Sequence, residues 1–142
     1  MADDDPDDCL LAGEAFRENR LANDLHFVAD GVELMDYLHR RGEYADGADA
    51  PRPMLVLLDL NMPKKNGREA LAEIKADPSL CTIPIVVLST SSAEEDILRT
   101  YQLGVNSFIT KPVTFEGLVE VVKSLDHYWF DLVQLPGVRR DV

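Results

Sequence analysis

Acidic, hydroxyl and lysine side chains stand at the ends of successive apolar runs in this sequence. Asp59 follows one apolar run, Ser89 follows the next, and Lys111 follows the last. A strongly acidic run, residues 3–8, lies near the N-terminus. In open α/β sheets the ligand site lies at the carboxyl ends of the strands, so we expect these residues to converge.

Such a group of side chains can bind a divalent cation and a phosphoryl group together. Mg²⁺ prefers a few carboxylate oxygens together with water and phosphate oxygens. A carboxylate nucleophile can form an aspartyl-phosphate, whose oxygens are stabilised by a metal, a lysine and a hydroxyl. Taken singly, Asp59 could be a turn residue or helix cap, Ser89 a buried hydroxyl and Lys111 a surface lysine. Their combination favours phosphoryl chemistry at Asp59.

The elements that must position these residues alternate along the chain. Continuous apolar runs predict parallel strands buried on both faces, at residues 25–29, 54–58, 83–88 and 105–109. Helical spacing of apolar residues predicts helices, over residues 7–19 and around residues 32–38, 70–74, 97–101 and 118–122. Alternation of this kind predicts right-handed βαβ units and a doubly wound α/β sheet.

Composition limits the class of protein. The chain has 142 residues, 46% of them hydrophobic, which suits one domain with a single core. A net charge of −12 disfavours nucleic-acid binding. The longest apolar run, residues 53–58, is far below the roughly 20 residues of a membrane span, and no signal-peptide pattern opens the chain. We therefore expect a cytoplasmic protein without membrane contact, with Cys9 and Cys81 reduced.

At this point the sequence resembles the response-regulator receiver domains of two-component systems. The motifs that carry the resemblance occur in the family's order and spacing over nearly the whole chain: Asp3-Asp4, Asp59-Leu60-Asn61-Met62-Pro63 with Gly67, Ser89-Thr90, Phe108 and Lys111-Pro112. The resemblance implies a (βα)5 CheY-like, flavodoxin-like three-layer sandwich with parallel strand order 2-1-3-4-5. Residues 1–126 would form this receiver domain and residues 127–142 a C-terminal extension.

The resemblance implies a metal site and its ligands. Asp59 resembles the phosphoacceptor, and Asp3 and Asp4 resemble the acidic pair that holds Mg²⁺. The carboxylate of Asp59 and the backbone carbonyl of Asn61 would be further ligands. The alternative for Asp3 and Asp4 is a solvated acidic start of the chain, with Asp5 or Asp7 as a helix cap.

The resemblance also implies a switch. Ser89 resembles the hydroxyl that turns toward the phosphoryl group, and Phe108 occupies the aromatic switch position, although an ordinary core role is nearly as well supported. Lys111 resembles the lysine that pairs with a phosphoryl oxygen, and the bond from Lys111 to Pro112 would be cis. Asp59, Ser89 and Lys111 would carry the chemistry.

A narrower resemblance concerns the small regulators that partner phytochrome histidine kinases. It rests on residues 30–33, 41–44, 51–53, 64–69, 93–98 and 127–130. It implies that the partner is a sensor histidine kinase of the bacterial phytochrome type. Apolar residues from Tyr128 onward either fold back on the domain or form an interface. The same resemblance favours a homodimer through the 93–135 face and the C-terminal aromatics.

One departure and three alternatives remain. Only Met1 and Ala2 precede Asp3, where the family has a full interior strand; we expect either that the natural chain begins upstream or that another chain supplies the pairing. An aspartyl-phosphate hydrolase needs a second acid where Asn61 stands, so we expect no enzyme beyond slow autophosphorylation and autodephosphorylation. A phosphorylation-independent module would normally lose an acid or Lys111. Flavodoxin-like FMN binding conflicts with the acidic first loop.

Overall fold

The structure, a computed structural model, describes residues 1–19, 25–45, 51–90, 94–112 and 114–132. Helices and strands alternate in it as the apolar spacing predicts. Their bounds are α1 Pro6–Glu18, α2 Gly31–His39, the 3₁₀ turn η2 Gly42–Tyr44, β1 Val56–Leu58, α3 Gly67–Ala76, β2 Ile85–Ser89, α4 Glu94–Gln102, β3 Ser107–Thr110, α5 Phe115–Leu125 and the π-helical turn η3 Asp126–Leu132.

The three strands form one parallel sheet in the order β1-β2-β3. Val56 lies opposite Ile85, and Val87 lies opposite Phe108. Beyond β1, the sheet continues through isolated parallel bridges of Ala2 with Leu58 and Val28. The spatial order is therefore Val28, Ala2, β1, β2, β3, which corresponds to the predicted 2-1-3-4-5 arrangement.

Residues 1–3 occupy the place of an interior strand and make backbone hydrogen bonds to the segments on both sides. The Ala2 N–H donates to Leu57 O at 2.8 Å, and Ala2 O accepts from the Asp59 N–H at 3.0 Å. On the other side, Val28 N–H donates to the Met1 carbonyl, and the Asp3 N–H donates to the Val28 carbonyl. The pairing is short, but it places Asp3 at the same sheet edge as Asp59. The predicted strand at residues 25–29 is reduced to the bridge at Val28.

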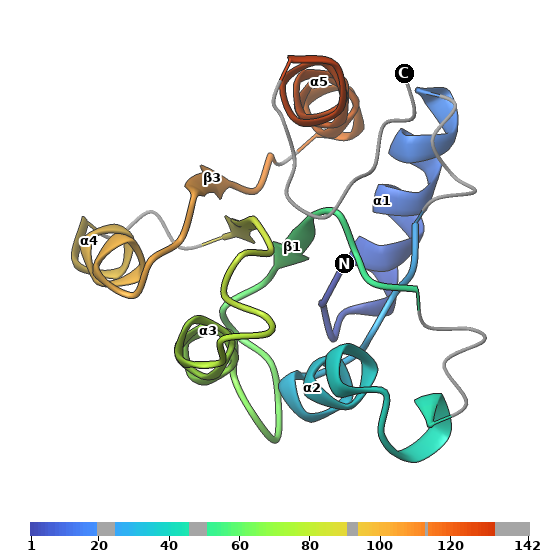
Figure 1. Cartoon of the computed structure of the whole chain (residues 1–142). Coiled ribbons are helices and arrows are strands. Elements are labelled where there is room, and N and C mark those ends of the chain that lie inside the picture. The colour runs from blue at the N-terminus through green and yellow to red at the C-terminus, as the bar shows by residue number, and fades with distance from the viewer. Residues whose placement is uncertain (20–24, 46–50, 91–93, 113, 133–142) are drawn as a thin grey trace.

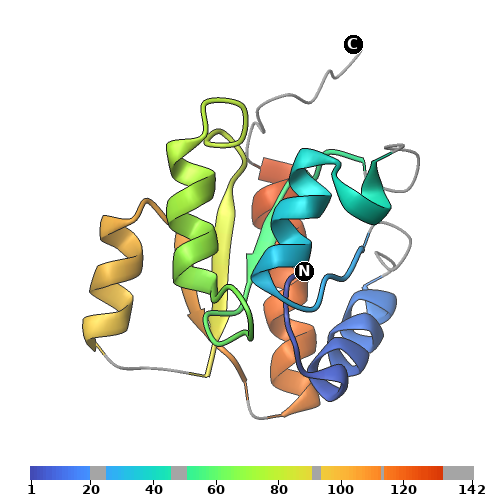
Figure 2. The same ribbon diagram turned by 90° about the horizontal axis from the view of Figure 1, so that it is seen from below.

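Helices cover both faces of the sheet. Figures 1 and 2 show α1 and α5 on one face and α2, α3 and α4 on the other. Because side chains alternate along a strand, Leu57 and Val86 join the core beneath α1 and α5. Leu58 and Val87 join the core beneath α2 and α3. The result is the three-layer sandwich that the family resemblance implies.

Local signals begin and end the helices. Asp30 is the N-cap of α2, and its carboxylate accepts from the Glu33 N–H at 2.8 Å. Asn66 and Glu69 form a capping box at the start of α3. Gly104, with φ of +100°, follows the end of α4, as a helix-terminating glycine does. Residues 91–93, which precede α4, lie outside the described residues.

No helix in the described ranges is long and apolar enough to cross a membrane. The described part of the C-terminal extension continues directly from α5. Trp129 is buried against Phe16, Val122 and Leu125, while Tyr128 is exposed.

Candidate functional site

Asp59 lies directly after β1, at the carboxyl end of the sheet. Its side chain is buried, and the residue is 7% exposed. Burial raises the pKa of its carboxyl to about 6; the charge of Lys111 and a hydrogen bond from the Asn61 N–H oppose this rise, and the charges of Asp3 and Asp4 add to it. A cation beside this buried carboxylate would stabilise its ionised form.

The backbone around Asp59 is held by a close approach from α3. The Gly67 N–H donates to Leu60 O at 2.9 Å. A Cβ on Gly67 would overlap the backbone of Asp59 and Leu60, so the position requires glycine. This contact fixes where the Asp59 side chain leaves the strand.

Asp3 and Asp4 bring their carboxylates to Asp59. One carboxylate oxygen from each of the three residues lies within 4.8 Å of the others. Asp3 is 1% exposed, whereas Asp4 is exposed to solvent. Like charges this close are unfavourable unless a cation lies between them, and hard oxygen donors suit a hard divalent cation. The donor set therefore fits the predicted metal site.

Lys111 reaches this cluster from the end of β3. Its Nζ lies 2.7 Å from an Asp3 oxygen, 2.7 Å from an Asp8 oxygen and 3.9 Å from an Asp59 oxygen. Burial lowers the pKa of the ammonium, but hydrogen bonds to Asp3 and Asp8 outweigh that effect and raise it above its usual range. Lys111 is therefore a charged lysine at the site.

The expectation of a cis bond before Pro112 is wrong, because the described chain contains no cis peptide bond. Three other contacts position the lysine instead. The Lys111 N–H donates to Ser89 O at 2.7 Å, and the two carboxylates of Asp3 and Asp8 bind its ammonium.

Sequence reasoning missed Asp8 as a member of the site. In the sequence, Asp8 belongs to the acidic run of residues 3–8. Asp5 of this run is the helix cap, since its carboxylate accepts from the Asp7 N–H at 2.9 Å. The available signal was the place of Asp8 in the first turn of the helix that begins just after Asp3. A helix starting at the sheet edge turns one of its first side chains back toward that edge.

The two predicted switch residues lie on β2 and β3, which end at this edge of the sheet. Ser89 ends β2 and is fully buried, and Phe108 lies in β3 partly buried against the core. The Phe108 N–H donates to the Tyr101 hydroxyl of α4 at 3.2 Å. The structure thus joins Asp3, Asp4, Asp59 and Lys111 directly, while the switching roles of Ser89 and Phe108 and the ligand role of the Asn61 carbonyl stay predictions.

Known proteins share this sequence and fold. Residues 1–123 match the family described as response regulator receiver domain. The chain is 40% identical over 137 residues to the response regulator Rcp1 of a Synechocystis strain, covering 96% of this chain and 91% of that protein. A crystal structure of Rcp1 in an Mn²⁺-bound form has a TM-score of 0.81 and covers 95% of both chains.

Two further solved structures are similar over nearly their whole length. The phosphorylated cyanobacterial phytochrome response regulator RcpA is 47% identical with a TM-score of 0.86, covering 95% of this chain and 94% of that chain. The response regulator RPA3017, in red light signaling of R. palustris, is 36% identical with a TM-score of 0.90, covering 96% of each.

The CheY-like fold, the acidic cluster facing a lysine and the family match over residues 1–123 agree. The chain therefore belongs to the response-regulator receiver domains, the phosphorylation-dependent signalling domains of two-component systems.

Proposed function

We propose that Asp59 is the phosphoacceptor of this receiver and that Asp3 and Asp4 hold Mg²⁺ beside it. The observation that carries this proposal is the meeting of three carboxylates from two segments with the Lys111 ammonium. The Asn61 backbone carbonyl is the further protein ligand that we assign. All donors are hard oxygens, which favours Mg²⁺ over metals that prefer nitrogen or sulfur.

The residues divide the work of phosphoryl transfer. A partner kinase presents a phosphohistidine, and an Asp59 oxygen attacks the phosphorus as the P–N bond breaks and the imidazole leaves with the bonding pair. Bound Mg²⁺ supplies charge neutralisation for the phosphoryl oxygens. Lys111 donates to one of those oxygens, and Ser89 donates to another, which draws Ser89 toward the site.

The signal leaves through protein contacts. The added charge at Asp59 shifts a pre-existing equilibrium in which Phe108 and α4 change position. Receiver domains act as phosphoacceptors rather than enzymes, and we assign at most slow autophosphorylation and autodephosphorylation to this one. Because RcpA is a phytochrome response regulator and RPA3017 is a response regulator in red light signaling, we propose a sensor histidine kinase of the phytochrome type as the partner.

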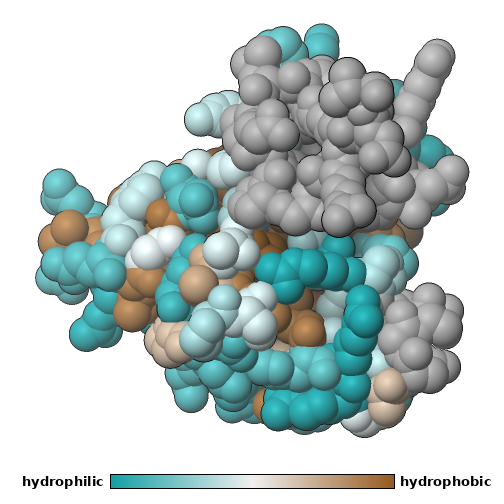
Figure 3. All heavy atoms as spheres, viewed as in Figure 1, coloured by the Kyte–Doolittle hydropathy of each residue, from teal (hydrophilic) through white to brown (hydrophobic). Residues whose placement is uncertain are grey.

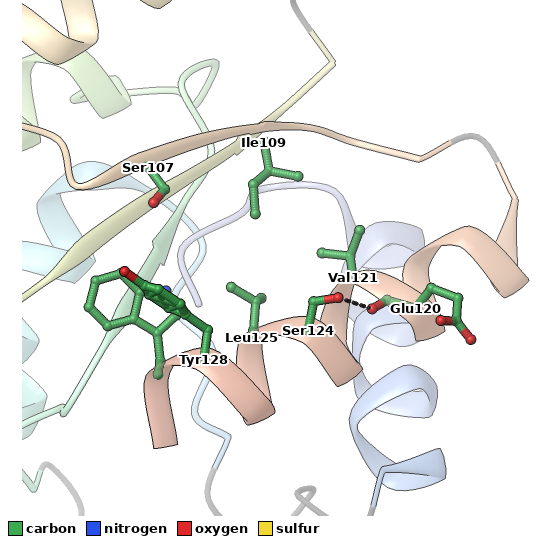
Figure 4. A pocket seen from close by; sticks show the side chains of 8 residues that line it. Ser107, Ile109, Glu120, Val121, Ser124, Leu125 and Tyr128 are labelled. Atoms are coloured by element: carbon green, nitrogen blue, oxygen red, sulfur yellow. Dashed lines mark hydrogen bonds between the residues drawn. The ribbon is translucent and has the colours of Figure 1, made fainter. Parts of the chain in front are cut away.

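We further propose a second copy of this chain as a partner of the face formed by α4, β3, α5 and η3. A groove of about 370 Å³ lies between β3 and α5, lined partly by Ile109, Leu125 and Tyr128. Figure 4 shows Ile109 and Leu125 pointing toward one another across it. Residues 93, 113 and 133–135 of the predicted interface lie outside the described residues.

Exposed apolar side chains on the same face support this choice. Leu98 is 60% exposed on α4, and Tyr101 and Tyr128 are also exposed. In Figure 3, hydrophobic atoms over α4, at the left, stand among mainly hydrophilic ones. Burying such residues in a symmetric contact removes apolar surface from water.

A phosphorylation-independent module is the weaker alternative, because this chain keeps the acids and the lysine that such a module loses. The deciding experiment is intact mass after incubation with acetyl phosphate, with and without Mg²⁺, for the wild type and Asp59→Asn. We expect a Mg²⁺-dependent gain of one phosphoryl group in the wild type and none in the variant. A gain of the same size in Asp59→Asn would show that another residue is the phosphoacceptor.

A further inference from the structure

The Lys111 ammonium is bound by two carboxylates that differ in burial and in whether they belong to the predicted metal site. Asp3 is part of the carboxylate cluster that fits the metal, and its side chain is fully buried. Asp8 comes from the first turn of α1, and its side chain is 33% exposed. Both lie 2.7 Å from Nζ, whereas the Asp59 oxygen lies 3.9 Å away. In this resting arrangement, the lysine is hydrogen-bonded to Asp8 and not to Asp59.

Asp8 is placed to act on the lysine rather than on the metal. The group of carboxylates within 4.8 Å of one another contains Asp3, Asp4 and Asp59 and does not include Asp8. The ammonium has three N–H donors, and two of them are used by Asp3 and Asp8. The third N–H can donate to a phosphoryl oxygen on Asp59, but the attraction of the ammonium to Asp8 opposes its movement toward that oxygen.

We propose that Asp8 is a positioning residue that holds Lys111 on the α1 side of the site and competes with the phosphoryl group on Asp59 for it. This inference rests on the proposed function. Phosphorylation replaces the single charge of the Asp59 carboxylate by up to two charges on the phosphoryl group, a net gain of one, so the ammonium shifts toward the phosphoryl oxygens and the contact with Asp8 weakens. The strength of that contact then tunes how stable the phosphorylated state is.

Removal of the Asp8 charge should change the stability of the phosphorylated state in one direction. Without the Asp8 charge, only one of the two carboxylates that bind the lysine still opposes its movement toward the phosphoryl group. The phosphorylated state is therefore stabilised relative to the resting state. The conservative change Asp8→Glu keeps the charge and should preserve the competition, whereas Asp8→Asn removes it.

The test uses beryllofluoride, which binds a phosphoacceptor aspartate as an analogue of the phosphoryl group, in the presence of saturating Mg²⁺. Dissociation constants are measured by ¹⁹F NMR for the full chain and its variants. The matched control is Asp7→Asn, the same change in the same helical turn. Asp7 is exposed and has no ion pair with Lys111 in the structure. It corrects for the loss of one negative charge near the site.

We expect Asp8→Asn to bind beryllofluoride about three- to tenfold more tightly than the wild type, and Asp8→Glu and Asp7→Asn to stay within about twofold of it. A second measurement, without metal, is the melting temperature in EDTA. It should fall by about 2–4 °C for Asp8→Asn, through the lost ion pair, and not for Asp7→Asn.

Equal effects of Asp8→Asn and Asp7→Asn on beryllofluoride binding would overturn the inference, because general charge would then explain both. Weaker binding by Asp8→Asn would overturn it as well. Failure of the wild type itself to bind beryllofluoride would instead contradict the proposed function of Asp59. The two failures are therefore distinguishable.

Discussion

The guanidinium of Arg68 lies 2.7 Å from the carboxylate of Asp96 and joins the start of α3 to the start of α4. Arg68 follows Gly67, whose backbone packs against Asp59, so the ion pair connects the site-bearing segment to the helix assigned to move. Both side chains are mostly buried, which makes the pair stronger than a fully exposed one.

Loss of this ion pair is expected to destabilise the docking of α4. We predict that Arg68→Ala lowers the melting temperature by about 2–4 °C, because roughly 1 kcal/mol of pairing is lost. Arg99→Ala, an exposed arginine of α4 for which the structure records no ion pair among the described residues, is the control and should change it little. Equal shifts for the two variants would show that the pair contributes nothing measurable.

The raised pKa of Asp59 predicts how stability depends on pH without metal. The folded pKa of about 6 exceeds the unfolded value near 4, so the ionised carboxylate costs stability above pH 6 and the cost disappears as pH falls through that window. Asp59→Asn should therefore be more stable than the wild type in EDTA at pH 8, by about 1–3 kcal/mol, and similar to it near pH 4. Urea unfolding at several pH values measures this. A gap that does not change with pH would exclude titration of Asp59 as its cause.

Divalent metal is expected to stabilise the folded protein through Asp3, Asp4 and Asp59. At a Mg²⁺ concentration of 100 times the dissociation constant, the gain is about 2.7 kcal/mol. Asp3→Asn should lose most of it, whereas Glu116→Gln, on the exposed start of α5, should keep it. Thermal unfolding with Mg²⁺ and with EDTA is the measurement. An undiminished Mg²⁺ shift in Asp3→Asn would remove that residue from the metal site.

Gly67 and Gly13 provide an opposed pair of alanine substitutions. A Cβ at Gly67 meets the Asp59 backbone, so Gly67→Ala should cost about 2 kcal/mol or more and reduce phosphorylation. At Gly13, inside α1, nothing lies within 4 Å of an added Cβ. Gly13→Ala should stabilise the protein by about 0.5–1 kcal/mol. Urea unfolding of both variants is sufficient, and a neutral Gly67→Ala would disprove the close approach.

Self-association should depend on the α4 face. Leu98→Glu places a charge on the proposed dimer surface, so we expect a shift from dimer to monomer in sedimentation velocity. Leu10→Glu is the matched control, because Leu10 is 65% exposed on α1, away from that face. A wild type that remains monomeric when concentrated, or equal effects of the two changes, would contradict the proposed dimer.

Local sequence signals predicted most elements because they depend on neighbouring residues. The apolar run ending before Asp59 forms β1, and Asp30 caps α2 as its residue type suggests. The strand predicted at residues 25–29 was overestimated. Its length depends on a partner strand, and residues 1–3 can pair with it only around Val28.

The residue types of the site could be predicted in the same way. Asp59, Ser89 and Lys111 each follow an apolar run, and parallel strands bring such ends to one edge. The trans bond before Pro112 could not be predicted from the resemblance. Isomer choice at proline depends on a small energy difference that the surrounding packing decides.

The sequence by itself determined the doubly wound fold, the acidic cluster and the lysine that faces it, because residue type and periodicity act over short stretches. Only the tertiary structure decided that Lys111 pairs with Asp8, 103 positions away, at 2.7 Å. That contact exists because the packing of α1 beside α5 brings the first turn of α1 to the end of β3. A local sequence pattern cannot predict such a contact, because its geometry depends on how whole helices and strands pack.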